Sequence, residues 1–180
     1  NIFARLITMN EENEQKSIQG FSFTAKLFHW GFILIFSYGI LKQIDNINQL
    51  EDLALLKFEI IFALLFILFL IVRFIYMKRT QTSSLPPDTT KFQKSAAKLV
   101  HYGMYVTMIS IALSGLVIGF LYWLGWKSGL LIETIIFWHE SSVSIVYWLI
   151  GLHLLGAVYH WVKNDGVWES MVPILNRNRE

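Results

Sequence analysis

The chain has 180 residues, of which 54% are hydrophobic and only 16% are charged, and its formal net charge is +2. In soluble domains about a quarter of the residues are charged, so this composition favours a membrane protein. The sequence contains no cysteine. This absence excludes a disulfide framework, an iron–sulfur cluster held by thiolates and the covalent attachment motif of c-type haem.

Four apolar stretches approach or exceed the roughly 20 residues that a helix needs to cross a bilayer. In chain order they cover residues 25–44, 53–77, 99–124 and 132–162. The first follows a mostly polar segment, and no small-residue cleavage site comes after it, so we expect a retained span rather than a signal peptide. The sequence therefore predicts an all-α fold, an integral membrane four-helix bundle over residues 25–165, with a polar N-terminal tail over 1–24 and a C-terminal tail over 166–180.

Charges at the ends of these stretches predict the orientation. The connection after the first stretch carries Asp45, Glu51 and Asp52 and no basic residue between positions 42 and 57. The connection after the second has one acid, Asp88, and five basic residues: Lys78, Arg79, Lys91, Lys94 and Lys98. Basic loops stay in the cytoplasm, so we expect both termini to be cytoplasmic. The basic loop could also serve as a docking surface for a partner.

The sequence has five histidines, and all of them fall inside the predicted spans: His29, His101, His139, His153 and His160. Ionisable residues inside a bilayer are costly and usually mark function, although a single one could be a hydrogen-bonded core residue. His139 and His153 are 14 residues apart, which places them within about 40° of one helix face and about 21 Å apart along the axis. Two histidines at that separation can each ligate a different haem.

A haem iron takes an axial imidazole, and six-coordination needs a second one from a facing helix. The first and fourth spans are antiparallel, so His29 lies level with the end of the fourth span. Depth alone does not separate His153 from His160 as its partner, but the 14-residue spacing and the small residues near His153 favour His153. Those residues, Gly151, Gly156 and Ala157, would leave room for a porphyrin; their competing use is close helix packing.

Three spaced motifs resemble those of the bacterial cytochrome b561 family, over roughly residues 23–165. They are Phe28-His29-Trp30 in the first span, Lys98-Leu-Val-His101-Tyr102 in the third, and Trp138-His139-Glu140 followed by Gly151-Leu-His153 and His160 in the fourth. The resemblance implies a four-helix cytochrome with two b haems in the bacterial inner (cytoplasmic) membrane, which takes electrons from quinol. One branch of the family oxidises superoxide while reducing quinone.

Carried over to this chain, the resemblance implies that His29 and His153 ligate the haem nearer the cytoplasm. His139 would be one ligand of the periplasmic-side haem. The family's second ligand there is a histidine 14 residues before an arginine that matches Arg73, and this position holds Glu59. Glu59 could ligate the iron, fill the site and accept a hydrogen bond from His139, or be a surface residue at a helix end. We therefore expect one haem b, with two as the alternative.

The resemblance does not make His101, His160 or Arg73 a haem ligand. His101 and His160 are candidates for a quinone site, where an imidazole donates to a quinone oxygen and takes up a proton on quinol oxidation. Alternatively, both are interfacial histidines among aromatic residues. Arg73 would either neutralise a haem propionate or extend to the membrane surface.

Three functions remain open from the sequence. The chain could be a stand-alone quinone-linked oxidoreductase, which the resemblance extends to superoxide. It could be an electron-transfer subunit docked on a larger respiratory or dehydrogenase complex, as small haem subunits are on hydrogenases. It could also be an accessory or structural subunit with one haem or none. Its expected surroundings are membrane lipid and quinone, and no signature of a nucleotide, a flavin or nucleic acid is visible.

Overall fold

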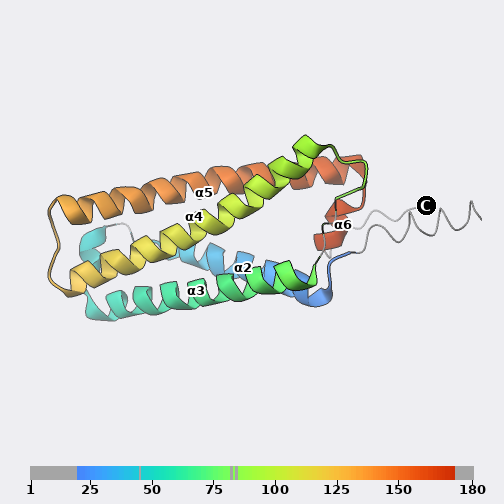
Figure 1. The fold of residues 1–180 in the computed structure, drawn as a ribbon. Helices are drawn as coiled ribbons and strands as arrows, with labels where there is room; N and C mark the ends of the chain where they lie inside the picture. The colour runs from blue at the N-terminus through green and yellow to red at the C-terminus, as the bar shows by residue number, and fades with distance from the viewer. Residues whose placement is uncertain (1–19, 45, 82, 84, 173–180) are drawn as a thin grey trace, which may run out of the picture.

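The computed structural model describes residues 20–44, 46–81, 83 and 85–172. Within this part every regular element is helical (Figure 1). Four long helices are α2 (Phe23–Leu41), α3 (Leu53–Thr80), α4 (Lys91–Trp123) and α5 (Leu130–Lys163), and two short ones are the 3-10 helix η1 (Ile47–Glu51) and α6 (Val167–Met171). By length and composition, α2, α3, α4 and α5 are each able to cross a membrane. The predicted all-α, four-span fold is confirmed.

Polar caps make two of the helices start where they do. The Asp52 side chain accepts a hydrogen bond from the Ala54 amide at 2.8 Å, which starts α3. α4 begins at a capping box in which Thr90 and Gln93 satisfy each other's backbone N–H groups. α4 therefore extends eight residues before the predicted span, because the apolar stretch marks only the part of the helix suited to the bilayer.

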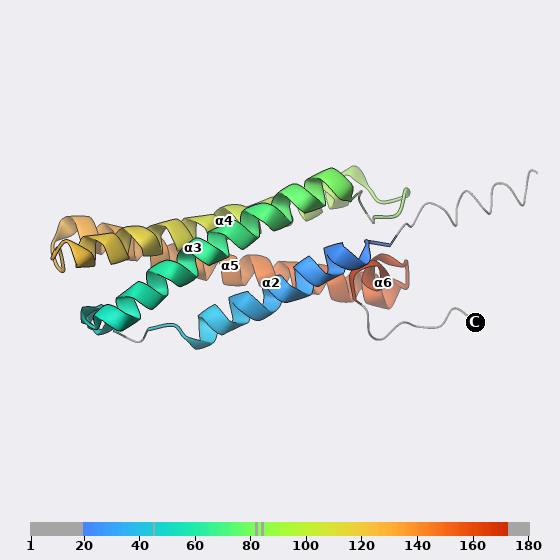
Figure 2. The same cartoon turned by 90° about the horizontal axis from the view of Figure 1, so that it is seen from below.

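The four long helices run antiparallel in chain order (Figures 1 and 2). α4 packs most closely against α5 and less closely against α3, and α2 packs against α3 over a smaller interface. Within the described residues, α2 and α5 form no comparable seam. The start of α2, the α3–α4 connection and α6 lie at one end of the bundle, which we call the loop end (Figure 1). The η1 helix and the α4–α5 connection lie at the other, which we call the η1 end.

In the part of the chain that the structure describes, the interior contains two clusters of buried side chains. The central cluster consists of Phe32, Phe66, Leu70, Met108, Ala112 and Val146. The second cluster closes the η1 end and consists of Leu50, Leu56, Ile118, Leu121, Tyr122 and Ile132. An exposed ion pair of 3.0 Å between Lys127 and Glu51 joins η1 to the α4–α5 connection at the same end.

The segment after α5, which the sequence suggested was a tail from residue 166, includes α6, which packs against α5 and is hydrogen-bonded to two side chains of α2. The Lys26 Nζ donates to the Glu169 carbonyl oxygen at 3.2 Å. The Trp30 indole N–H donates to the Met171 carbonyl oxygen at 3.2 Å. α6 thus ties the end of α5 to the start of α2. The rest of the predicted tails, residues 1–19 and 173–180, lies outside the described residues.

Candidate functional site

Three of the five histidines gather between α2, α4 and α5. The ring centres of His29 and His153 are 6.3 Å apart, and those of His101 and His153 are 4.9 Å apart. Two imidazoles that bind one metal ion through nitrogen at about 2 Å have ring centres roughly 6 Å apart. The His29–His153 pair has this separation, whereas the His101–His153 pair is too close to admit an iron atom between its rings.

Helix packing also distinguishes the His29–His153 pair from the His101–His153 pair. α4 and α5 are in tight contact beside His101, since a Cβ at Gly103 would lie 3.2 Å from Leu149. A Cβ at Gly156, which lies on the same face as His153, would meet no atom within 4 Å, and neither would one at Gly151. In this structure, close helix packing is the role of Gly103, while Gly151 and Gly156 leave open space along α5. A flat macrocycle beside His153 fits this surface.

Hydrogen bonds at Nδ1 determine which ring nitrogen can bind a metal ion. The His101 Nδ1 lies 2.6 Å from the Ala97 carbonyl oxygen, so Nδ1 donates and Nε2 keeps its lone pair. The His29 Nδ1 lies 2.9 Å from a guanidinium nitrogen of Arg73. Guanidinium can only donate. His29 therefore accepts through Nδ1 in this structure.

Arg73 turns into the bundle instead of extending to the membrane surface. Besides His29, its guanidinium contacts the Tyr105 hydroxyl at 2.6 Å. It lies against the rings of Phe32 and Tyr105, at 5.4 and 5.3 Å from their centres. The Arg73 Nε is buried and has no hydrogen-bond partner among the described residues. Of the two roles open from the sequence, the surface position is thus not the one observed.

His139 lies on α5 further toward the η1 end, half-buried against α4. Its Nδ1 is 2.9 Å from the Ser114 hydroxyl, which is itself placed to donate to the Ser110 carbonyl oxygen at 2.7 Å. Ser114 therefore accepts from His139, and the His139 Nε2 keeps its lone pair. The hydrogen bond from His139 that the sequence left open for Glu59 is made by Nδ1 with Ser114.

Glu59 lies half-buried on α3 at a different level from His139. Its neighbours on α3, Leu56 and Ile60, pack against Gly119, with Ile60 3.1 Å from the Cβ position of that glycine. His139 is level with Ser114, which precedes Gly119 by five residues and thus by about 7 Å along the helix. The structure brings no imidazole from α3 to face His139, because the described part of α3 contains none.

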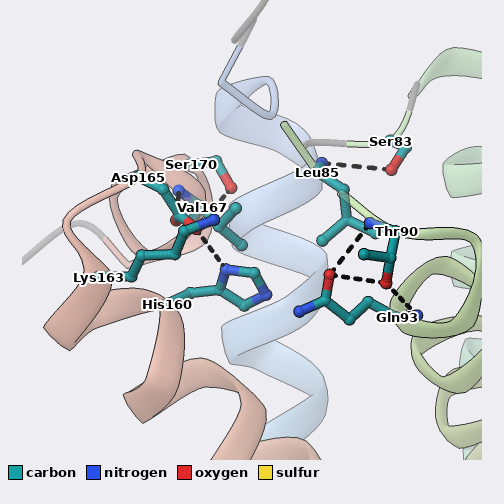
Figure 3. A network of polar contacts seen from close by, with 9 residues as sticks. All are labelled: Ser83, Leu85, Thr90, Gln93, His160, Lys163, Asp165, Val167 and Ser170. Atoms are coloured by element: carbon teal, nitrogen blue, oxygen red, sulfur yellow. Dashed lines mark hydrogen bonds and ion pairs between the residues drawn. The ribbon is translucent and has the colours of Figure 1, made fainter. Parts of the chain in front are cut away.

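His160 forms a second polar centre near the loop end, with a partner that the sequence did not suggest. Its Nδ1 donates to the Asp165 carboxylate at 2.7 Å, and Lys163 lies 3.6 Å from the same oxygen (Figure 3). Asn164, with φ 55°, ends α5 in the left-handed conformation and turns the chain back. Asp165 is thereby placed against His160, with its side chain only 9% exposed.

The two quinone-site candidates lie in different surroundings. His101 is exposed and contacts His153, whereas His160 contacts Asp165 and Tyr159. Within the described residues, no cluster of three or more His, Cys, Asp or Glu side chains could hold a metal ion by itself. A haem iron, which receives four nitrogens from its porphyrin, needs only one or two imidazoles from the protein.

Comparison with known proteins gives one match. The model of a protein family described as prokaryotic cytochrome b561 matches residues 20–173, most of the chain. No curated protein sequence and no solved structure matches the chain significantly.

Proposed function

This chain belongs to the prokaryotic cytochrome b561 family, and on that premise we propose that His29 and His153 ligate a b-type haem between α2 and α5. Family membership and the four apolar helices make the chain a multi-pass membrane b-type cytochrome of electron transport. The observation that supports the ligand assignment is the 6.3 Å separation of the two rings. The open glycine surface beside His153 and the absence of an α2–α5 seam support it further.

In this proposal each residue of the site has a separate task. Bound haem supplies a carrier that takes up and gives up one electron at a time. His29 and His153 would hold it, and two imidazole ligands would keep the iron's coordination the same in both oxidation states. Gly156 leaves space for the flat ring. The Leu149–Gly103 contact keeps α4 against α5, so that His101 stays beside His153 without competing for the iron.

We propose further that the chain holds one haem. A second haem at His139 would need an opposing ligand from α3, where the resemblance puts Glu59 at the position of the family's histidine. The interior on both sides of His139 is filled by the central cluster and by the cluster that closes the η1 end. With one haem near the loop end, electrons would enter and leave on one side of the membrane. This favours a cytochrome that relays electrons between quinol and a partner at that side.

The proposed quinol-oxidising group is His160. Quinol gives up protons as well as electrons, so its site needs a proton acceptor within hydrogen-bond reach. With Nδ1 held by Asp165, the His160 Nε2 is the acceptor, and the carboxylate stabilises the imidazolium that forms. His160 follows His153 by seven residues, or about 10 Å along α5, so a quinol there lies near the haem.

Asp165→Asn tests this role. The substitution keeps an oxygen that can accept from the Val167 amide but removes the negative charge beside His160. We expect quinol-driven haem reduction to slow by about 10²-fold or more, the range that positioned acid–base groups contribute. The dithionite-reduced spectrum should be unchanged. Lys163→Met is the matched control, since Lys163 contacts the same carboxylate but cannot accept a proton from quinol; a wild-type rate in Asp165→Asn would contradict the assignment.

We propose that the loop end faces the cytoplasm. Basic residues of the α3–α4 connection are concentrated there, while Glu51 and Asp52 lie at the η1 end. A reporter that is active only in the periplasm, fused after Glu180, should therefore be silent, and the same reporter inserted after Asn46 should be active. Activity of the fusion after Glu180 would reverse the orientation.

A further inference from the structure

The guanidinium of Arg73 lies inside the bundle without a paired carboxylate among the residues that the structure describes. Within the described residues, no carboxylate forms an ion pair with it; the ion pairs there involve Lys127, Lys163 and His160. Its hydrogen-bond partners, the Tyr105 hydroxyl and His29 Nδ1, are neutral acceptors. A cation inside a membrane protein is costly unless an opposite charge compensates it. An anionic group from outside the described residues would compensate this charge.

The geometry also shows where that anion would be. Arg73 lies on α3 beside His29, about 10 Å inside the end of the helix at Thr80. Its Nε is buried without a partner, while the rings of Phe32 and Tyr105 flank the guanidinium. The charge is thus fixed next to a proposed haem ligand and retains an unused donor. Haem b carries two propionate carboxylates, which accept hydrogen bonds in the bidentate manner that guanidinium favours.

The contact between Arg73 and His29 is a second reason to expect an anion beside Arg73. A neutral imidazole that binds iron through Nε2 carries its proton on Nδ1, and guanidinium cannot accept that proton. The Arg73–His29 hydrogen bond and an Nε2–iron bond thus exclude each other. If His29 held iron through Nε2, Arg73 would lose this acceptor, and a carboxylate would replace it.

We propose that Arg73, positioned by Tyr105, is the counter-ion for a propionate of the haem held by His29 and His153, and that its charge sets the haem's reduction potential. The inference rests on the proposed haem site. A fixed positive charge near the iron stabilises the ferrous over the ferric state. Removing the charge leaves the propionate uncompensated, which favours the ferric state and lowers the potential.

The test is a redox titration of the purified holoprotein, followed by the rate of haem transfer to an excess of apomyoglobin. Arg73→Gln should lower the midpoint potential by about 59 mV, equal to a tenfold change in the one-electron equilibrium constant. It should also speed haem loss at least tenfold. Arg73→Lys, which keeps the charge, should restore most of the potential. Tyr105→Phe, which keeps the ring but removes the acceptor, should lower the potential by less than Arg73→Gln.

Lys78→Gln is the matched control, because Lys78 is an exposed cation near the end of the same helix. A wild-type potential in Arg73→Gln, or an equal fall in Lys78→Gln, would overturn the proposal. So would a potential in Arg73→Lys as low as that in Arg73→Gln. If Arg73→Gln does not fold, an unchanged potential in Tyr105→Phe would count against it. Purified wild-type protein without haem would instead contradict the haem site itself.

Discussion

Replacing His153 with alanine is expected to remove the haem of this cytochrome. In the proposed site His153 would be one of two imidazole ligands, and a haem held by His29 alone would be high-spin and weakly held. Mutation of outer-shell partners alone already costs roughly 10–100-fold in metal affinity, so loss of a ligand should cost at least as much. The measurement is the low-spin absorbance of the purified protein together with its haem content by the pyridine haemochrome assay.

His101→Ala is the control for this experiment. His101 is the other imidazole in ring contact with His153, but its 4.9 Å separation and the tight α4–α5 packing leave no place for a porphyrin. We expect His101→Ala to keep haem content and the low-spin spectrum. An unchanged bis-histidine spectrum in His153→Ala would show that His153 is not the ligand. Loss of haem in His101→Ala instead would show the same.

The fold was accessible from the sequence because a membrane span is specified by the length of its apolar run. All four spans were located that way. The helix ends were not, since polar caps such as Thr90 extend α4 beyond the apolar run, and hydropathy does not detect them. α6 was missed for a related reason. Its five residues carry no periodic pattern, and the hydrogen bonds that hold it are made from Lys26 and Trp30 to its backbone carbonyls.

The candidate site could be predicted from the sequence only in part. Antiparallel order and the 14-residue spacing suggested that His29 and His153 meet, and in the structure they do. The approach of His101 depends on the register between α4 and α5, which spacing within one helix does not determine. The sequence does not determine whether the Arg73 side chain turns into the bundle or toward the membrane surface. Asp165 faces His160 because of the left-handed residue Asn164, and an Asn-Asp-Gly sequence after a helix is the only signal that could have suggested this turn.

The number of haems per chain is the second quantity for which we expect a clear result. The purified protein should contain about one haem per chain, because only the His29–His153 pair offers two facing imidazoles. His139→Ala should therefore leave haem content and spectrum unchanged, whereas in a two-haem cytochrome it would remove half of the haem. The pyridine haemochrome assay on equal amounts of both proteins measures this. Two haems in the unmodified protein, or a loss in His139→Ala, would refute the proposal.

Glu59→His separates the two physical reasons for a single haem. If the missing imidazole alone excludes the second haem, this substitution should raise the haem content from about one toward two per chain. The His139 Nε2 keeps its lone pair and could then ligate iron opposite position 59. If packing excludes it, the content should stay near one, because Leu56 and Ile60 press against Gly119 and Glu59 lies about 7 Å beyond the level of His139. The close packing on both sides of that level leads us to expect the second result. Glu59→Gln, which adds no ligand, is the control in either case.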